Sequence, residues 1–431
     1  MEECSMMREG LLKKSFGVLL IRGMGVILLF LFSLFLTNYY SAEQVGQYDF
    51  VRATIMILSG ASLIGTNQSL IYYSGFLNSK NSLKSIKDIY FKMTRMTTGI
   101  CMIFILGYLI IPEGFINELF DKNNAHSLIL KAIVALFFYT TTMLNIDALR
   151  ALNQTIHSEL YRNVFRYTPI FILSIVLFFT QNQEWLIEAF LAGFILLSLI
   201  TTIKTLILFK KLNLSNQTSY RFSYSQIFSR SYPMALSAIA YFIMQSVDII
   251  ILTVYEGFDN VAHYSIAVKL ATVTALALMS VNIVIAPKIA EIYNTNDFNR
   301  LNKLIRDAAR IIFIISLPVL LILFIFSGPT LSLFGEGYVF AKQALWVLLA
   351  GQFFSALCGP GAIYLNMTGK QKKLNNILIS GLIVNVVLNL VLIPIYGIEG
   401  AAIATLISMV FWNSLIVAVI YRADRIKIFI S

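Results

Sequence analysis

Long apolar runs, separated by short polar segments, recur from one end of the chain to the other. A helix of about 20 mostly apolar residues crosses about 30 Å of hydrocarbon, so each run is long enough to span a bilayer. We interpret the first run as a permanent span, because Glu2 and Glu3 precede it and no cleavage pattern follows it. The pattern predicts an all-α polytopic protein with about twelve membrane helices, at residues 15–37, 45–76, 94–112, 127–149, 163–180, 185–209, 232–254, 262–289, 310–327, 341–365, 376–394 and 400–421.

An internal repeat relates the two halves of this pattern. Residues 36–39 and 43–48 align with residues 252–255 and 259–264, at an offset of 252 − 36 = 216. The offset covers about six helices, an even number, so both halves have the same orientation in the membrane. We therefore predict two parallel six-helix bundles that enclose a central cavity, an arrangement typical of transporters with alternating access. Their expected limits are residues 1–215 and 216–431.

The distribution of charge predicts the orientation of the chain. Lys and Arg concentrate on the cytoplasmic side of membrane proteins. Here they fall into alternate polar segments, at residues 8–14, 80–92, 150–162, 210–230, 300–306, 370–373 and 422–427. The intervening loops carry mainly Glu and Asp. Both termini are therefore predicted to be cytoplasmic.

Composition agrees with a membrane protein and argues against other classes. The chain is 58% hydrophobic and 13% charged, whereas about 25% of residues are charged in an average soluble domain. The net charge of +11 does not indicate nucleic-acid binding, because the basic residues lie in short loops and not on one face of a soluble domain.

No sequence feature indicates an enzyme. The outer loops are too short to form a domain, and no phosphate-binding loop, nucleotide fingerprint or nucleophile elbow is present. His126, His157 and His263 lack the spacing of metal ligands, and the three cysteines are far apart. We therefore expect no catalytic residues, no metal and no cofactor.

Several motifs resemble bacterial polysaccharide flippases. The C-terminal stretch resembles the eleventh and twelfth helices of O-antigen flippases, and its matching positions are 368–370, Asn385, 392–394, 396–397 and 400–405. Residues 36–48 resemble the first loop of the same proteins, and residues 232–252, 261–264 and 287–290 resemble their seventh and eighth helices. The chain is thus similar to the multidrug, oligosaccharidyl-lipid and polysaccharide (MOP) exporter superfamily along nearly its whole length.

This resemblance implies a fold and an activity. The superfamily fold is a V-shaped pair of six-helix bundles. Its saccharide members move undecaprenyl-diphosphate-linked oligosaccharides outward across the bacterial inner membrane, for assembly of O-antigen or related polysaccharides. We assume a functional monomer, with the polymerase and chain-length proteins of the same pathway as candidate partners.

Cationic residues inside the spans are the first candidates for a binding site. A charge at the centre of a membrane helix costs about 2.5 to 3.5 kcal/mol, so such a residue normally faces a cavity or a partner. Arg22 and Arg52 lie roughly 10 to 12 Å inside the membrane by helical rise, and Lys269 matches position 53 in the repeat. Because Arg and Lys suit phosphate recognition, we predict that all three contact a diphosphate headgroup. The alternatives are an ion pair between Arg52 and Asp49, and contacts of Arg22 or Lys269 with helix-end carbonyls.

Polar residues in the spans supply further candidates. Asp248 is predicted to face the cavity and to bind H⁺ or Na⁺ that couples transport to the membrane potential; an ion pair with Lys269 is the alternative. Asn67, Gln245 and Asn282 are predicted to bind sugar hydroxyls, although such side chains also join helices to one another.

Two other functions remain open at this stage. A multidrug or organic-cation antiporter of the same superfamily would favour a cavity dominated by carboxylates, and a membrane-embedded saccharide polymerase would favour a long outer loop or an acidic cluster. The sequence provides neither feature.

Overall fold

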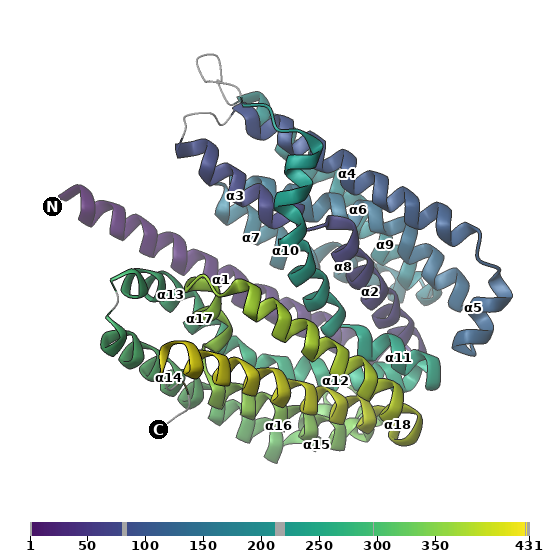
Figure 1. Ribbon diagram of the computed structural model, residues 1–431. Coiled ribbons are helices and arrows are strands. Elements are labelled where there is room, and N and C mark those ends of the chain that lie inside the picture. Colours follow the sequence, from purple (N-terminus) through teal and green to yellow (C-terminus); the bar gives the residue numbers. More distant parts are fainter. Residues whose placement is uncertain (1, 80–83, 212–219, 296, 427, 429–431) are drawn as a thin grey trace. The chain divides into compact units, whose positions relative to one another are not determined.

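The computed structural model describes residues 2–79, 84–211, 220–295, 297–426 and 428, and every regular element in these ranges is a helix (Figure 1). This confirms the all-α class. By their contacts the residues form two compact units, Met1–Phe242 and Ile243–Ser431, which are described separately below. The boundary expected from the repeat, between residues 215 and 216, falls within residues 212–219 and so lies outside the described residues.

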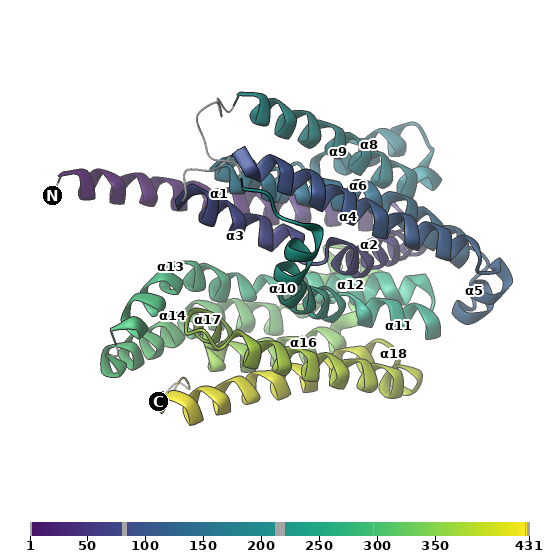
Figure 2. The same ribbon diagram turned by 45° about the horizontal axis from the view of Figure 1, so that its top comes forward.

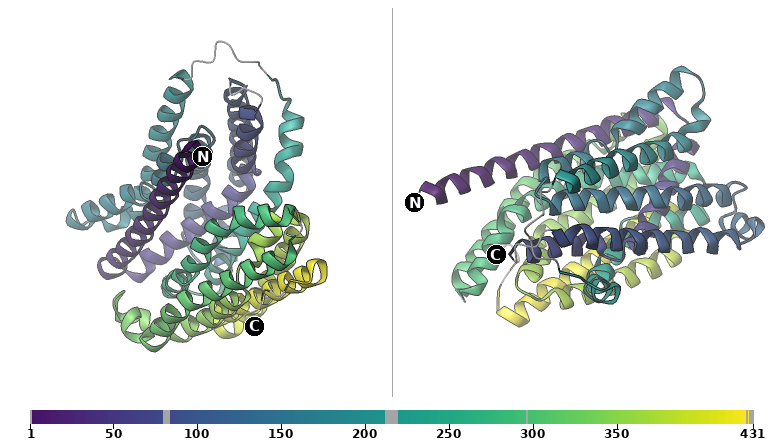
Figure 3. Two further views of the ribbon diagram at one scale, coloured as in Figure 1. Left: turned by 90° about the vertical axis from the view of Figure 1, so that its left-hand side faces the viewer. Right: turned by 90° about the horizontal axis from the view of Figure 1, so that it is seen from above.

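The N-terminal unit contains nine α-helices and most of a tenth within its described ranges. They are α1 (Glu2–Tyr39), α2 (Ala42–Leu63), α3 (Thr66–Ser79), α4 (Lys84–Leu109), α5 (Glu113–Phe120), α6 (Ala125–Ala151), α7 (Thr155–Asn163), α8 (Thr168–Phe179), α9 (Leu186–Lys211) and α10 (Tyr224–Met244). Figure 3 shows α1 as one long helix. α6 packs against α2, α3, α4, α7 and α9 and forms the centre of this unit.

The C-terminal unit is built around α16 and α18. Its helices are α11 (Val247–Tyr255), α12 (Phe258–Val273), α13 (Ala275–Asn294), α14 (Phe298–Ile325), α15 (Ser327–Ser332), α16 (Lys342–Cys358), α17 (Gly361–Met367) and α18 (Gln371–Asp424). α16 packs against α18, α14 and α12. Figure 2 shows α18 folding back on itself.

The reversal in α18 explains the most specific sequence motif. Gly397 has φ +53°, a left-handed conformation that only glycine adopts without strain. A Cβ at Gly400 would lie 2.2 Å from the carbonyl oxygen of Leu392, so only glycine permits the two halves to approach this closely. Asn385 then donates to the hydroxyl of Ser408 across the hairpin, at 3.2 Å. The motif therefore forms a tight helical hairpin from the predicted spans 376–394 and 400–421.

Within the described ranges, nine helical segments are long and apolar enough to cross a membrane, compared with the twelve expected. The difference has a physical cause. α18 contains two predicted spans, and the predicted spans 45–76 and 232–254 are each broken into two helices. The first break lies at Ile64 and Gly65, which both have positive φ, and the second lies at Gln245 and Ser246.

Helix ends preserve the internal repeat. α1 ends at Tyr39 and α11 at Tyr255, while α2 begins at Ala42 and α12 at Phe258. Both pairs keep the offset of 216, and the equivalent Tyr48 and Tyr264 are both buried.

The first part of α10 packs within the N-terminal unit. A Cβ at Gly65 would lie 2.5 Å from the backbone nitrogen of Ala235, so the break between α2 and α3 closely approaches α10. The hydroxyls of Ser69 and Ser231 are 2.7 Å apart. These contacts explain why α10 up to Phe242 groups with the N-terminal helices, although the sequence repeat assigned residues 232–254 to the second bundle.

Candidate functional site

α2 carries Arg52 into the interior of the N-terminal unit. The helix starts at a capping box, in which the Ser41 hydroxyl accepts from the backbone N–H of Gln44 and the Gln44 side chain accepts from that of Ser41. Three turns later the Arg52 Nε donates to Asp49 Oδ1 at 3.1 Å. Asp49 is fully buried, whereas the Arg52 side chain is 21% exposed. The sequence-based alternative of an ion pair between these two residues is therefore present.

Arg166 is the second cation of this site. It lies in the turn at residues 164–167, which separates α7 from α8 within one membrane span. Pro169 stands in the first turn of α8, where its missing N–H costs no helical hydrogen bond. An Arg166 Nη2 donates to the Tyr139 hydroxyl at 3.1 Å, and the guanidinium lies over the rings of Tyr139 and Tyr167, 5.4 and 5.7 Å from their centroids.

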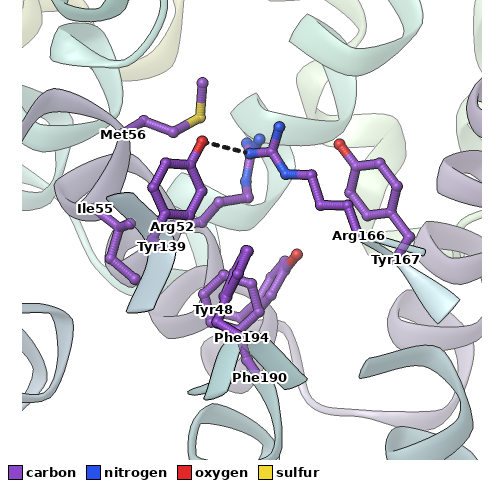
Figure 4. Close-up of a pocket in the computed structure, with 9 residues that line it drawn as sticks. All are labelled: Tyr48, Arg52, Ile55, Met56, Tyr139, Arg166, Tyr167, Phe190 and Phe194. Atoms are coloured by element: carbon purple, nitrogen blue, oxygen red, sulfur yellow. Dashed lines mark hydrogen bonds between the residues drawn. The ribbon is translucent and has the colours of Figure 1, made fainter. Parts of the chain in front are cut away.

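Arg52 and Arg166 line one narrow pocket of the N-terminal unit (Figure 4). The space between its lining atoms is about 270 Å³, which includes open solvent, and the enclosed part is no larger than a water molecule. Its remaining lining residues are Tyr48, Ile55, Met56, Tyr139, Tyr167, Phe190 and Phe194. Edge-to-face contacts hold the aromatic wall, with centroid distances of 4.9 Å from Tyr48 to Phe190 and 5.0 Å from Phe194 to both Phe190 and Tyr139. We call this the two-arginine pocket.

The two-arginine pocket has an excess of positive charge. Arg52 is paired with Asp49. Arg166 forms no ion pair with any carboxylate of the described residues and instead contacts Tyr139 and Tyr167. An arginine without a counter-ion in a membrane span is costly unless an anion or water reaches it. Two guanidinium groups with planar arrays of donors are suited to phosphate oxygens. The pocket is therefore a candidate anion site.

Sequence reasoning missed Arg166. The predicted span 163–180 placed it close to the end of a helix, where a basic residue reaches the interface without cost. The structure instead joins α7 and α8 into one segment, Thr155–Phe179, that is long and apolar enough to cross a membrane, and Arg166 lies near the middle of this segment. The closely following Pro169 was the available signal, since a proline indicates a helix start.

Arg22 has a different environment. Its Nε and Nη2 donate to Glu159 Oε2 and Oε1 at 2.8 and 3.1 Å, which joins α1 to α7. Glu159 is 1% exposed and also accepts from Asn163 Nδ2 at 3.1 Å. A Cβ at Gly25 would lie 2.7 Å from Asn163, so α1 and α7 are in very close contact here. Neither the sequence-based headgroup role of Arg22 nor the carbonyl alternative anticipated this bidentate pair.

Asp248 belongs to a buried polar cluster of the C-terminal unit. It lies in the first turn of α11, directly after the break at Gln245 and Ser246. The Tyr264 hydroxyl donates to Asp248 Oδ2 at 2.7 Å, and the Thr405 side chain lies beside this hydroxyl. Asp248 is 6% exposed. A buried carboxylate beside a broken membrane helix is a frequent setting for a coupling ion.

Hydrogen bonds extend this cluster along α18. Ser408 donates to the Thr405 carbonyl at 2.9 Å and accepts from Asn385, and Asn389 Nδ2 donates to Asn385 Oδ1 at 3.1 Å. Asn389 is fully buried, and its Oδ1 has no hydrogen-bond partner among the described residues. A carboxylate, hydroxyls and an available amide oxygen are the donors that hard cations prefer.

The other predicted site residues are dispersed. Lys269 lies on α12 with a partly buried side chain. Asn282 lies on α13, and its buried Oδ1 has no hydrogen-bond partner in the described part of the chain. Gln245 is exposed at the break after α10. Asn67 lies on α3, but its side chain is outside the described residues. Arg22 and Arg52 are in the N-terminal unit. The C-terminal unit contains the predicted site residues beyond Phe242, which are Gln245, Asp248, Lys269 and Asn282.

Comparisons with known proteins connect this geometry to a family of transporters. Residues 233–391 match the MatE family. The fold of the chain superimposes on the lipid II flippase MurJ in an inward closed conformation with a TM-score of 0.74, at 16% identity, over 95% of this chain and 87% of that one. It superimposes on an inward-facing multidrug resistance MATE family transporter of the MOP superfamily with a TM-score of 0.72, at 16% identity, over 96% and 98% of the two chains. The chain has the MATE fold.

A curated relative extends the comparison. The chain is 29% identical to a Shigella flexneri protein named "Putative O-antigen transporter" over 173 residues, 40% of this chain and 41% of that one. The match thus spans less than half the length of that relative. All these proteins are named as transporters or flippases and none as an enzyme, in agreement with the sequence-based prediction. The resemblance to the MOP superfamily is confirmed. Lipid flippases and multidrug transporters both have the MATE fold, so the fold is common to both kinds of transporter.

Proposed function

We propose that this protein flips an undecaprenyl-diphosphate-linked oligosaccharide from the cytoplasmic to the periplasmic leaflet of a bacterial inner membrane. Alternating access between the two units would carry the saccharide, as part of O-antigen or related polysaccharide assembly. The excess positive charge of the two-arginine pocket is the observation that supports this proposal most strongly.

The chemistry of the pocket matches one part of such a substrate. A diphosphate carries concentrated negative charge on oxygens that accept paired N–H donors, and Arg52 and Arg166 supply such donors from one pocket. Tyr139 and Tyr167 hold the Arg166 guanidinium from two sides, which limits the entropy lost on binding. The pocket as it stands has room for about one water molecule, so a phosphate group of the headgroup would enter it only after the pocket widens during alternating access, and a sugar chain would stay outside it.

An organic-cation antiporter fits the two-arginine pocket less well. An organic-cation antiporter needs carboxylates available to its substrate, but Asp49 is already paired with Arg52 and fully buried. The relative named for O-antigen transport and the lipid II flippase with the same fold both favour a lipid-linked saccharide.

A transport assay tests the proposal directly. The purified protein would be reconstituted into liposomes with a fluorescent undecaprenyl-diphosphate oligosaccharide, and flipping would be followed by the rate at which the fluorophore becomes accessible to a membrane-impermeant quencher. We expect flipping above protein-free liposomes. A protein that does not flip this lipid but exchanges organic cations for protons would overturn the proposal and favour the antiporter.

We also propose that the Asp248 cluster couples transport to H⁺ or Na⁺. Asp248→Asn is expected to remove the acceleration of flipping by an imposed pH or Na⁺ gradient and to leave the gradient-independent rate within about twofold, because the amide keeps the acceptor for Tyr264 but loses the charge. The measurement is the flipping rate with and without each gradient.

Asp259→Asn is the matched control for this variant. It removes one carboxylate from an exposed position of the neighbouring α12 and should leave the gradient response unchanged. A full gradient response in Asp248→Asn would contradict the coupling proposal.

Orientation and partners are part of the same proposal. Both termini would be cytoplasmic, and the protein would act as a monomer beside the polymerase and chain-length proteins of its pathway. The alternate distribution of Lys and Arg between loops supports this orientation.

A further inference from the structure

A cationic groove lies at the beginning of α4, apart from the two-arginine pocket. One wall is the first part of α4, and the other is the segment at residues 220–221 that leads to α10. The groove encloses about 990 Å³ of space, which includes open solvent, and is lined by Ser85, Lys87, Asp88, Phe91, Lys92, Tyr220 and Arg221. Figure 2 shows the segment before α10 running beside this end of α4.

Hydrogen bonds fix the two walls of the groove to each other. The backbone N–H of Tyr220 donates to the Ser85 hydroxyl at 2.7 Å, and Lys92 Nζ donates to the carbonyl of Phe222 at 2.8 Å. Arg95 reaches the Tyr224 hydroxyl at 3.4 Å. The groove is therefore a formed feature of the N-terminal unit and not a chance gap between a helix and a loose loop.

The groove carries an uncompensated positive charge. It contains three cations, Lys87, Lys92 and Arg221, and one carboxylate, Asp88. Lys92 Nζ lies 2.8 Å from Asp88 Oδ2, so this pair is neutral. Within the described residues neither Lys87 nor Arg221 takes part in an ion pair, and both side chains are exposed. Two cations are thus available to an anionic ligand.

The position of the groove identifies the kind of anion. Ser85–Leu109 is long and apolar enough to cross a membrane, and Lys87 lies in its first turn, where lipid headgroups would begin. Phe91, Tyr220 and Tyr224 are exposed aromatic residues beside the cations. Aromatic rings and basic side chains together match the boundary between headgroups and acyl chains.

We propose that this groove binds the headgroup of an anionic phospholipid. Lys87 and Arg221 contact the lipid phosphate, and the exposed rings lie against the glycerol and the upper acyl chain. The lipid would bridge α4 and the segment before α10. This assignment is independent of the transported substrate, because it involves neither Arg52 nor Arg166.

Lipid binding by the full-length protein in detergent tests this inference. Native mass spectrometry would measure the retention of phosphatidylglycerol, with phosphatidylcholine as the neutral comparison. The Lys87→Gln, Arg221→Gln double variant is expected to lose roughly thirtyfold in phosphatidylglycerol affinity. Each basic residue near a membrane surface contributes a factor of about five to six, and the two factors multiply. The Lys87→Arg, Arg221→Lys variant should retain parental affinity.

The matched control removes the same charge elsewhere. Lys372 and Lys373 are exposed at the start of α18, and Lys372→Gln, Lys373→Gln should leave phosphatidylglycerol affinity unchanged. An equal loss of phosphatidylglycerol affinity in the two double variants would show that the effect comes from the net charge of the protein, and it would overturn the proposal. It would also be overturned by equal retention of phosphatidylcholine, or by sn-glycerol 3-phosphate binding as tightly as the lipid, which would indicate a site for soluble phosphate.

Discussion

Replacement of Arg166 by alanine is expected to lower the initial rate of saccharide-lipid flipping by roughly tenfold to a hundredfold. A hydrogen bond between charged groups contributes about 1.5 to 3 kcal/mol, and Arg166 has no carboxylate among the described residues to which its charge is already committed. Tyr139→Phe should have a smaller effect, about threefold, because it removes the hydroxyl that orients the guanidinium but keeps the ring beneath it.

The measurement is the reconstituted flipping rate at matched protein insertion. Lys211→Ala is the control, since it deletes one positive charge from an exposed position at the end of α9. Arg166→Lys separates charge from geometry: it keeps the charge but loses the planar donor array, so an intermediate rate is expected. Flipping by Arg166→Ala at the rate of the parent would exclude the two-arginine pocket as the headgroup site.

Replacement of Glu159 by alanine is expected to destabilise the protein by roughly 2 kcal/mol. Breaking a buried ion pair on one side leaves the other charge without compensation, which costs about 3 to 5 kcal/mol when both groups are fully buried. Arg22 is 37% exposed, so solvent reduces this penalty. The apparent Tm in detergent should fall by several degrees.

A double-mutant cycle tests the origin of this effect. Arg22→Ala, Glu159→Ala should be more stable than Glu159→Ala alone, because it removes the isolated charge as well as its partner. Simple addition of the two single losses would contradict a coupled pair. The double variant also tests the headgroup role of Arg22 predicted from the sequence, because a variant that is stable but does not flip lipid would assign Arg22 a transport role in addition to its structural one.

The break in a membrane span shows where sequence reasoning lost information. The apolar pattern placed a helix at 163–180, and hydropathy alone does not reveal that α7 and α8 share one span with a turn inside it. The position of Arg166 within the span depends on that turn. Likewise, the pairing of Arg22 with Glu159 joins residues 137 positions apart, and no local pattern encodes such a contact.

The class of protein and its internal repeat follow from the amino-acid sequence alone. Runs of apolar residues long enough to cross a bilayer leave no alternative to membrane helices, since backbone groups in hydrocarbon must bond within the segment. The glycines at 397 and 400 likewise determined the C-terminal hairpin, through backbone constraints that act locally. The Arg52–Asp49 pair lies within one turn of α2 and is visible in the sequence, whereas the partners of Arg22 and Arg166 depend on tertiary packing. Arg22 and Arg166 differ because packing brings the carboxylate of Glu159 to the first and tyrosine rings to the second.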